Sequence, residues 1–183
     1  PTTGPDDSRQ HLRELAMDRI RVEQELHRGV ANSEMVLRLQ PITDTRTKRA
    51  AGFEALVRWC HPERGLISPT AFVALAEETG LIVPIGRWVL EKACEMLVRL
   101  EAARPAGAAP LFMAVNLSAR QIGDPGLVEG VRSILETTGI EPSNLKLEVT
   151  ESVLMTDPDR AVEVLGRIHT LGVRLAVDDF GTG

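Results

Sequence analysis

A repeated helix signature most narrows the folds open to this chain. From residue 35 onward, short β-rich runs alternate with amphipathic segments, and three of these segments open on Ser-Pro or Asp-Pro and close on Gly. A Ser or Asp oxygen can accept the free amide hydrogen bonds at a helix start, Pro suits the first helical position, and Gly suits the left-handed residue that ends a helix. The three predicted helices span residues 68–80, 124–139 and 157–172, and a fourth begins at Pro84. Strands that alternate with helices pair in parallel, so the sequence predicts an α/β fold.

Five strands are predicted between these helices. They span residues 36–42, 52–59, 111–117, 145–150 and 173–177. A doubly wound open sheet can stop at five strands, whereas a closed (β/α) barrel needs about eight strands and roughly 250 residues. The last predicted strand ends close to Gly183, so a barrel would be incomplete in this chain.

The first part of the chain is predicted to form a linker or signalling segment. Residues 1–10 are polar with Pro and Gly, and a helix is expected from His11 to Arg28. One seam of that helix carries four apolar residues, Leu12, Leu15, Val22 and Leu26. The seam is shorter than three heptads, which favours a linker helix over a coiled coil. We therefore divide the chain into a linker helix at residues 1–34 and one domain at residues 35–183.

Charge and composition exclude several classes of function. The formal net charge is −5, so no broad positive field exists to bind a nucleic-acid polymer, although a local basic pocket for one small anion stays open. No apolar run approaches the roughly 18 residues of a membrane span, so no membrane contact is expected from this segment. The two cysteines, Cys60 and Cys94, form no CxxC pair. This cysteine usage fits a reducing compartment, and a cytoplasmic location is expected.

Oxygen-bearing side chains lie in or just past four predicted strands. They are Glu54, Asn116, Glu148 and the adjacent pair Asp178 and Asp179. The carboxyl ends of parallel strands carry the active site in α/β folds. Two residues before these positions, on the same strand face, stand Gly52, Ala114, Lys146 and Ala176. Three of the four are small, which predicts a narrow face that ends in oxygen ligands. Lys146 departs from this pattern, and a salt bridge is the only role that we assign to it.

Four carboxylates and one amide at one end of a sheet repel one another, and a cation would hold them together. Oxygen ligands alone select Mg²⁺, Mn²⁺ or Ca²⁺ over zinc, which prefers His or Cys. Neighbouring carboxylates such as Asp178 and Asp179 can reach two ions about 3.5 to 4 Å apart. The sequence therefore predicts a two-metal site.

Six short motifs occur in a fixed order along the chain: QPI at 40–42, GFEALVRW at 52–59, HPERGLISP at 61–69, NLSARQ at 116–121, EVTES at 148–152 and DDFGTG at 178–183. Together they resemble the EAL-domain cyclic di-GMP phosphodiesterases, over residues 35–183. The resemblance implies an atypical TIM-like (β/α) barrel whose first strand is antiparallel to the others. It also implies Mg²⁺- or Mn²⁺-dependent hydrolysis of cyclic di-GMP to linear pGpG.

The resemblance also implies roles for individual residues. Glu54, Asn116, Glu148 and Asp178 would bind metal, and Asp179 would contribute to the second ion. Gln40 and Arg58 would contact the nucleotide. Glu151 would brace the loop at residues 180–183, which shapes the metal site and a homodimer surface. Where relatives commonly carry an aromatic residue before Gln40, this chain has Leu39, which puts one packing or stacking contact in doubt.

The resemblance covers the N-terminal portion of such a domain, because the lysine that activates the attacking water would lie beyond Gly183. We expect little or no catalysis from residues 1–183 alone, and we expect an upstream sensor or GGDEF domain. Two other functions stay open. One is a receptor that binds cyclic di-GMP without turnover, and the other is an unrelated Mg²⁺-dependent barrel enzyme.

Overall fold

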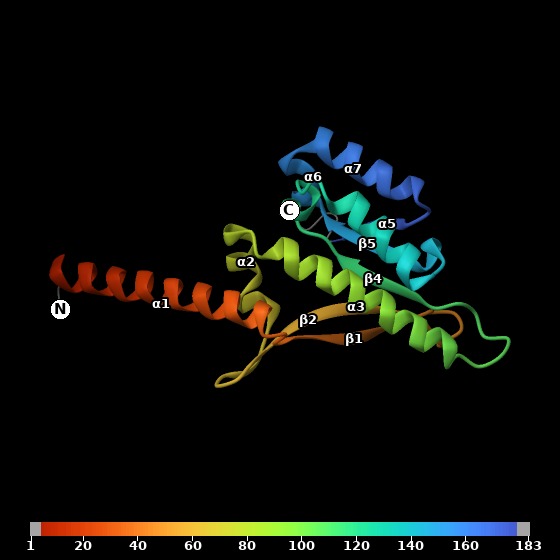
Figure 1. Cartoon of the computed structure of the whole chain (residues 1–183), viewed down its shortest axis with the longest axis horizontal. Helices are drawn as coiled ribbons and strands as arrows, with labels where there is room; N and C mark the ends of the chain where they lie inside the picture. Colours follow the sequence, from red (N-terminus) through yellow and green to blue (C-terminus); the bar gives the residue numbers. More distant parts are fainter. Residues whose placement is uncertain (1–4, 179–183) are drawn as a thin grey trace.

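A mixed sheet organises residues 5–178, which are the residues that the computed structural model describes (Figure 1). Its strands follow the order β1 (Met35–Thr43), β2 (Ala50–His61), β4 (Phe112–Asn116), β5 (Leu145–Thr150) and β6 (Arg174–Asp178). A short strand β3 (Gly65–Ile67) pairs with β2. Strands β2, β4, β5 and β6 are parallel, and β1 is antiparallel to β2. The predicted α/β class and the antiparallel first strand are therefore confirmed.

The sheet stays open within the described part of the chain, with β1 and β6 at its two edges. All five predicted strands are present, and the one at 145–150 has the predicted bounds. The prediction of only five strands was wrong, because β3 was missed. It pairs three residues of β2 across a turn that contains Gly65 at φ 69°. A strand of three residues is too short to show a hydrophobic period.

Helices lie before β1 and in the connections that follow β3, β4 and β5. They are α1 (Pro5–Ala31), α2 (Val73–Thr79), α3 (Ile82–Ala102), α4 (Ala119–Ile122), α5 (Leu127–Thr138), α6 (Glu151–Thr156) and α7 (Pro158–Thr170), with 3₁₀ turns η1 (Pro69–Ala71) and η2 (Pro142–Asn144). Helix α3 contacts β2 and β4, α5 lies between α3 and α7, and α7 contacts β6. These three long helices therefore form a layer on one face of the sheet (Figure 1).

Of the three helix starts predicted from a capping Ser or Asp, one is correct and two are wrong. Asp157 caps α7, because its Oδ1 accepts a hydrogen bond of 3.1 Å from the Arg160 amide. At Ser68 no side-chain cap forms, and the 3₁₀ turn η1 comes before α2. The Asp124 Oδ1 instead accepts from the Gly126 amide at 3.3 Å, and α5 begins only at Leu127. An Asp that bonds two residues ahead forms a local turn, which competes with helix capping.

Helix α1 extends beyond the predicted range at both ends, and its last turns are anchored on β2. Leu26 is buried and Val22 is half-buried, whereas the side chains of Leu12 and Leu15 lie outside the described residues. The Trp59 Nε1 donates a hydrogen bond of 2.9 Å to the Glu34 Oε2 just after the helix. A Cβ atom on Gly29 would lie 2.6 Å from the same nitrogen. Only glycine therefore lets α1 approach the strand this closely.

The hydrophobic core lies between the sheet and its helical layer. Strand side chains at alternate positions supply one side, including Met113, Val115, Leu147 and Val149. Helix α3 supplies the other side with Ile85, Val89, Ala93 and Leu97, which are all buried. Val177 belongs to the same strand face, but it is 46% exposed. It lies on β6, at the sheet edge, where described neighbours cover one side only.

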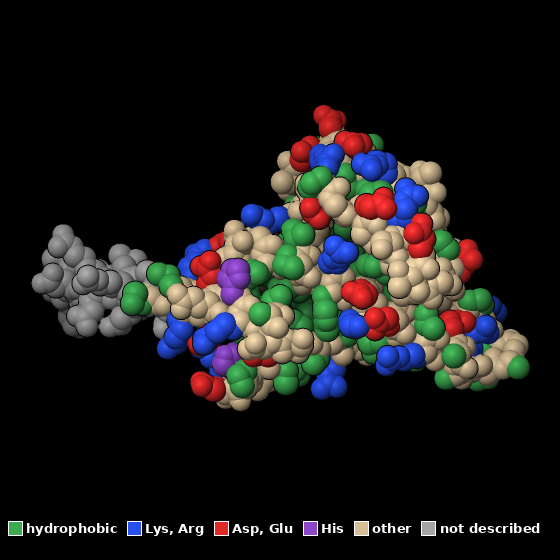
Figure 2. Space-filling model, in the orientation of Figure 1, with side chains coloured by type: hydrophobic (Ala, Val, Ile, Leu, Met, Phe, Trp, Pro, Cys, Tyr) green, Lys and Arg blue, Asp and Glu red, His purple; other side chains and the backbone are tan. Residues whose placement is uncertain are grey.

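The molecular surface carries both signs of charge. Figure 2 shows acidic and basic side chains interspersed on the face in view. Among the helices of residues 5–178, none is both long and apolar enough to cross a lipid bilayer.

Two cysteines differ in burial, and this difference predicts their reactivity. Cys94 on α3 is buried, whereas Cys60 on β2 is exposed. Burial raises the pKa of the Cys94 thiol from 9.0 to about 12, because the thiolate would lose its hydration. At about pH 8 we expect iodoacetamide to label Cys60 and to spare Cys94 until the protein unfolds. Peptide mass spectrometry measures both rates, and equal rates in the folded protein would contradict the burial.

The same thiol also predicts a direction for stability at high pH. The folded state keeps a proton on Cys94 that the unfolded state releases above its pKa of 9.0. This contribution to stability is therefore present below pH 9.0 and is lost as the pH rises toward about 12.

Candidate metal and nucleotide site

Strand register places the predicted oxygen donors on one face of the sheet. Glu54 is level with Ala114, Asn116 is level with Glu148, and Asp178 is level with Thr150. Side chains an even number of residues apart on a strand share a face, so Glu54, Asn116, Glu148 and Asp178 all lie opposite the helical layer. Their levels rise from β2 to β6, as in the staggered strands of a barrel. The predicted common face is therefore observed.

Glu54 and Asn116 are in direct contact. The Asn116 Nδ2 donates a hydrogen bond of 2.8 Å to the Glu54 Oε1, across 62 residues of sequence. This bond uses the amide nitrogen, so the Asn116 Oδ1 is the atom that can serve as an oxygen ligand. The structure thus brings together two donors from neighbouring parallel strands.

Glu148 has a different partner, which is Lys146 on the same strand. The Lys146 Nζ lies 2.6 Å from the Glu148 Oε1, and the two side chains are only 23% and 13% exposed. The salt bridge assigned to Lys146 from the sequence is therefore confirmed. The same Nζ lies 5.0 Å from the centre of the Phe112 ring, within range of a cation–π contact.

Phe112 is the first residue of β4 and lies on the same sheet face, toward the amino ends of the parallel strands. A Cβ on Gly52 would lie 2.7 Å from the Phe112 Cγ, so the small residue at 52 makes room for the ring. The Arg174 guanidinium lies 4.8 Å from the ring centre, beside Lys146 in the strand register. Two cations therefore contact the same aromatic ring.

The remaining predicted residues lie at the end of the chain or beyond the described part. Asp178 is exposed and is the last residue of β6. Glu151 is exposed and begins α6 directly after β5. Asp179 and the loop at 180–183, which Glu151 is predicted to brace, lie outside the described residues. Their roles therefore stay predictions.

The two predicted nucleotide contacts share the face of Glu54. Gln40 is exposed and lies directly opposite Glu54 in the antiparallel register of β1 and β2. Arg58 lies four residues beyond Glu54, and its Nη1 donates 2.8 Å to the Val57 carbonyl. The guanidinium is thus held against its own strand. It must turn outward to clamp a phosphate.

Leu39 belongs to the opposite face. It pairs with Ala55 and packs against the core. The replacement of the usual aromatic residue by Leu39 therefore affects packing between the sheet and the helical layer.

Sequence reasoning missed the residues that hold the turn after Asn116. The Ser118 Oγ accepts from the Gln121 amide at 3.3 Å, and the Ser118 amide donates to the Gln121 Oε1 at 3.1 Å. This capping box fixes the start of α4, and Gln121 is 4% exposed. Gly86 of α3 leaves room for the Gln121 amide. The spacing of Ser118 and Gln121 in NLSARQ is the signal that could have revealed it.

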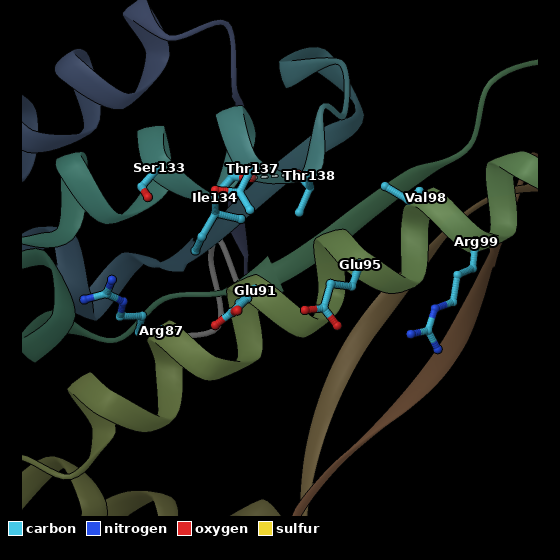
Figure 3. A pocket seen from close by; sticks show the side chains of 9 residues that line it. All are labelled: Arg87, Glu91, Glu95, Val98, Arg99, Ser133, Ile134, Thr137 and Thr138. Carbon is cyan, nitrogen blue, oxygen red and sulfur yellow. Dashed lines mark hydrogen bonds between the residues drawn. The ribbon is translucent and has the colours of Figure 1, made fainter.

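A cavity of about 360 Å³ lies at the carboxyl ends of the strands, and Asn116, Glu148 and Asp178 contribute to its lining. A second groove of about 440 Å³ lies between α3 and α5 (Figure 3). Arg87, Glu91, Glu95 and Arg99 line its α3 side, and Figure 3 shows hydroxyl groups on α5 across from them. None of the predicted donors lines this second groove. Three of them reach the smaller cavity, whereas Glu54 lines neither, so the cavity covers only part of the candidate site.

The donor types suit a hard cation, although no compact acidic cage is formed. Within residues 5–178, no group of three or more Asp, Glu, His or Cys side chains lies close enough to hold an ion. Asn116 binds Glu54 and Lys146 binds Glu148. Glu54 and Glu148 therefore have partners within the protein, and the cation that would hold the whole set together stays a prediction. Carboxylate and amide oxygens on one face nevertheless fit Mg²⁺ or Mn²⁺ by their chemistry.

Comparisons with known proteins agree with this geometry. The family model described as EAL domain matches residues 10–183. A signaling protein of Caulobacter vibrioides, described as uncharacterized, is 46% identical over 178 residues, which cover 97% of this chain and 20% of that protein. The bifunctional diguanylate cyclase/cyclic di-GMP phosphodiesterase MucR of Pseudomonas aeruginosa is 43% identical over 169 residues, which cover 92% of this chain and 24% of MucR.

A solved structure shows the same fold. The MucR phosphodiesterase in complex with c-di-GMP matches with a TM-score of 0.79 at 45% identity, over 87% of this chain and 64% of that one. The chain thus spans about a fifth to a quarter of the two curated relatives, at 20% and 24% of their lengths.

Proposed function

The chain belongs to the EAL domain family, and on this premise we propose that it is the N-terminal part of a metal-dependent phosphodiesterase that hydrolyses cyclic di-GMP to linear pGpG. One observation carries the proposal. Glu54, Asn116, Glu148 and Asp178 come from four neighbouring parallel strands and share one sheet face, and the first two are hydrogen bonded. Metal-dependent phosphodiester hydrolysis needs such a set of oxygen donors at one place.

Each residue has a role in this proposal. Glu54, Asn116, Glu148 and Asp178 hold Mg²⁺ or Mn²⁺, and Asp179 contributes to a second ion. When bound there, such ions would supply an activated water and would neutralise charge on the phosphate. Arg58 lies on β2, four residues beyond Glu54. It turns away from the Val57 carbonyl and binds a phosphate through two parallel hydrogen bonds.

Gln40 supplies a second contact to the nucleotide. Its position opposite Glu54 places its amide at the edge of the same site. An amide can donate and accept hydrogen bonds, so it can contact either a base or a phosphate oxygen.

The proposal extends to the partners and the setting of the protein. Glu151 braces the loop at 180–183, and that loop contributes to a homodimer surface. Residues 1–34 form a linker that connects the domain at 35–183 to an upstream sensor or GGDEF domain. The name of MucR combines a diguanylate cyclase with a cyclic di-GMP phosphodiesterase. This combination supports a second signalling domain in the same protein. The reaction takes place in the cytoplasm.

Hydrolysis by the full-length protein tests the function. With Mg²⁺ present, we expect cyclic di-GMP to be converted to pGpG, and we expect EDTA to abolish the reaction because the donors then lack their cation. Chromatography of the nucleotides measures both. A full-length protein that binds cyclic di-GMP and leaves it uncut is a receptor, and this result would refute the enzyme. A protein that binds no cyclic dinucleotide would indicate an unrelated metal-dependent enzyme.

Residues 1–183 alone provide a second arm of the same experiment. The sheet ends at β1 and β6 within the described residues, and open edges leave backbone groups without barrel partners. We expect little or no hydrolysis from this segment by itself. Sustained turnover by it would contradict the proposal that further strands complete the site.

A further inference from the structure

We propose that Lys146 is an internal counter-ion that competes with the divalent cation for Glu148 and thereby sets the metal concentration at which the site fills. The inference rests on the proposed metal site. It adds a residue that the family motifs do not assign, since Lys146 stands just before EVTES.

The geometry of the pair carries the first step. The Lys146 Nζ and the Glu148 Oε1 are 2.6 Å apart, a short charge-assisted contact. The side chains are 23% and 13% exposed, so water screens this pair less than an exposed surface pair. Both side chains project from the same face of β5, two residues apart. The pair is therefore built into the strand.

The surroundings of Lys146 hold the ammonium in place. Its Nζ lies 5.0 Å from the centre of the Phe112 ring, and that ring lies against Gly52. Arg174 covers the same ring at 4.8 Å and is level with Lys146 in the strand register. Lys146 thus lies between a carboxylate and an aromatic face. It is not a freely moving surface lysine.

Metal binding must change this arrangement. A divalent ion on Glu148 adds two positive charges next to an ammonium that already bonds the same carboxylate, and like charges in a partly buried site repel. The ion and Lys146 therefore compete for Glu148, and Lys146 turns toward Phe112 or solvent when the ion binds. Without metal, the same lysine neutralises Glu148. The lysine consequently stabilises the empty site and weakens the filled one.

Titration of the full-length protein with MnCl₂ in a calorimeter, without nucleotide, tests the competition. We expect Lys146→Gln to bind Mn²⁺ about tenfold more tightly than the wild type, because the ion then meets no ammonium group at Glu148. Arg174→Gln is the matched control. It removes a cation from the same register and the same ring, but it keeps the bond between Lys146 and Glu148, so its affinity should stay within about twofold. Lys146→Arg keeps the charge and should retain the wild-type affinity.

A thermal melt gives a second readout that a merely structural role would not produce. In EDTA, Lys146→Gln should melt below the wild type, because Glu148 loses its counter-ion. Added MnCl₂ should raise its melting temperature by more than it raises that of the wild type. Lys146→Met, which keeps the apolar stem on Phe112, serves the same comparison if the Gln variant does not fold.

The results separate this inference from the proposed function. Equal or weaker Mn²⁺ binding by Lys146→Gln would overturn the competition and leave the metal site intact. An equal gain in Arg174→Gln would overturn the specific role of Lys146 in favour of a general field. Absence of Mn²⁺ binding in both the wild type and the variant would overturn the metal site and this inference together.

Discussion

Replacing Glu54 by Gln lowers the rate of cyclic di-GMP hydrolysis by the full-length protein at least about a thousandfold, which corresponds to roughly 4 kcal/mol of transition-state stabilisation. Gln has nearly the volume of Glu and can still accept the hydrogen bond that the Asn116 Nδ2 donates to Glu54. The change therefore removes a charge from the cation site and leaves its shape. Initial rates of pGpG release at saturating Mg²⁺ measure the effect.

A matched variant tests whether the loss of any carboxylate, rather than of Glu54 in particular, lowers the rate. Glu91→Gln makes the same chemical change on α3, in the groove between α3 and α5 (Figure 3). None of the predicted donors lines that groove. We expect this variant to retain the wild-type rate. If Glu54→Gln also stayed within about tenfold of the wild type, Glu54 would not be a metal ligand, and the site would have to be placed elsewhere.

Truncation of Trp59 to Ala produces the largest expected loss of stability, about 3 to 5 kcal/mol. The side chain is 1% exposed and contacts two other rings edge-on, with centroids 5.1 Å away at His61 and 6.0 Å away at Phe72. Its indole also bonds Glu34, after α1. The substitution therefore opens a cavity where α1, β2 and the segment before α2 meet.

Amide hydrogen exchange of β2 and the last turns of α1 measures this loss in the full-length protein, because it reports local opening. Trp88→Ala provides the comparison, since Trp88 on α3 is only partly buried. We expect Trp88→Ala to cost clearly less in the exchange of its own helix. Unchanged protection in Trp59→Ala would show that α1 is not anchored through this ring.

Several features of the fold could be predicted because they depend on short stretches of sequence. The strand at 145–150 has the predicted bounds, since alternation of apolar and polar residues is a local pattern. Gly80 and Gly139 end α2 and α5 in the left-handed conformation, which few other residues adopt without strain. Both signals lie within a few residues of the structure that they specify.

The failures have a physical cause in common. Ser68 and Asp124 were predicted to cap helices, but local turns come first at both places. A capping oxygen can satisfy several nearby amides at similar free energy, so composition alone does not choose among them. Packing of the following segment against the core decides the choice. The same holds for β3, which exists only because β2 offers it a partner.

At the candidate site, features that depend on neighbouring residues could be predicted from the sequence, and features that depend on residues far apart in the chain could not. Alternation along each strand assigns Glu54, Asn116, Glu148 and Asp178 to one face before any partner is known, because side-chain direction is a property of the backbone itself. Contact between these residues, in contrast, depends on how the strands pair. The Asn116 bond to Glu54 joins residues 62 apart, and strand pairing alone sets which donors stand level with each other. Register depends on the free energy of the whole assembled sheet, so residues distant in the chain meet only after folding.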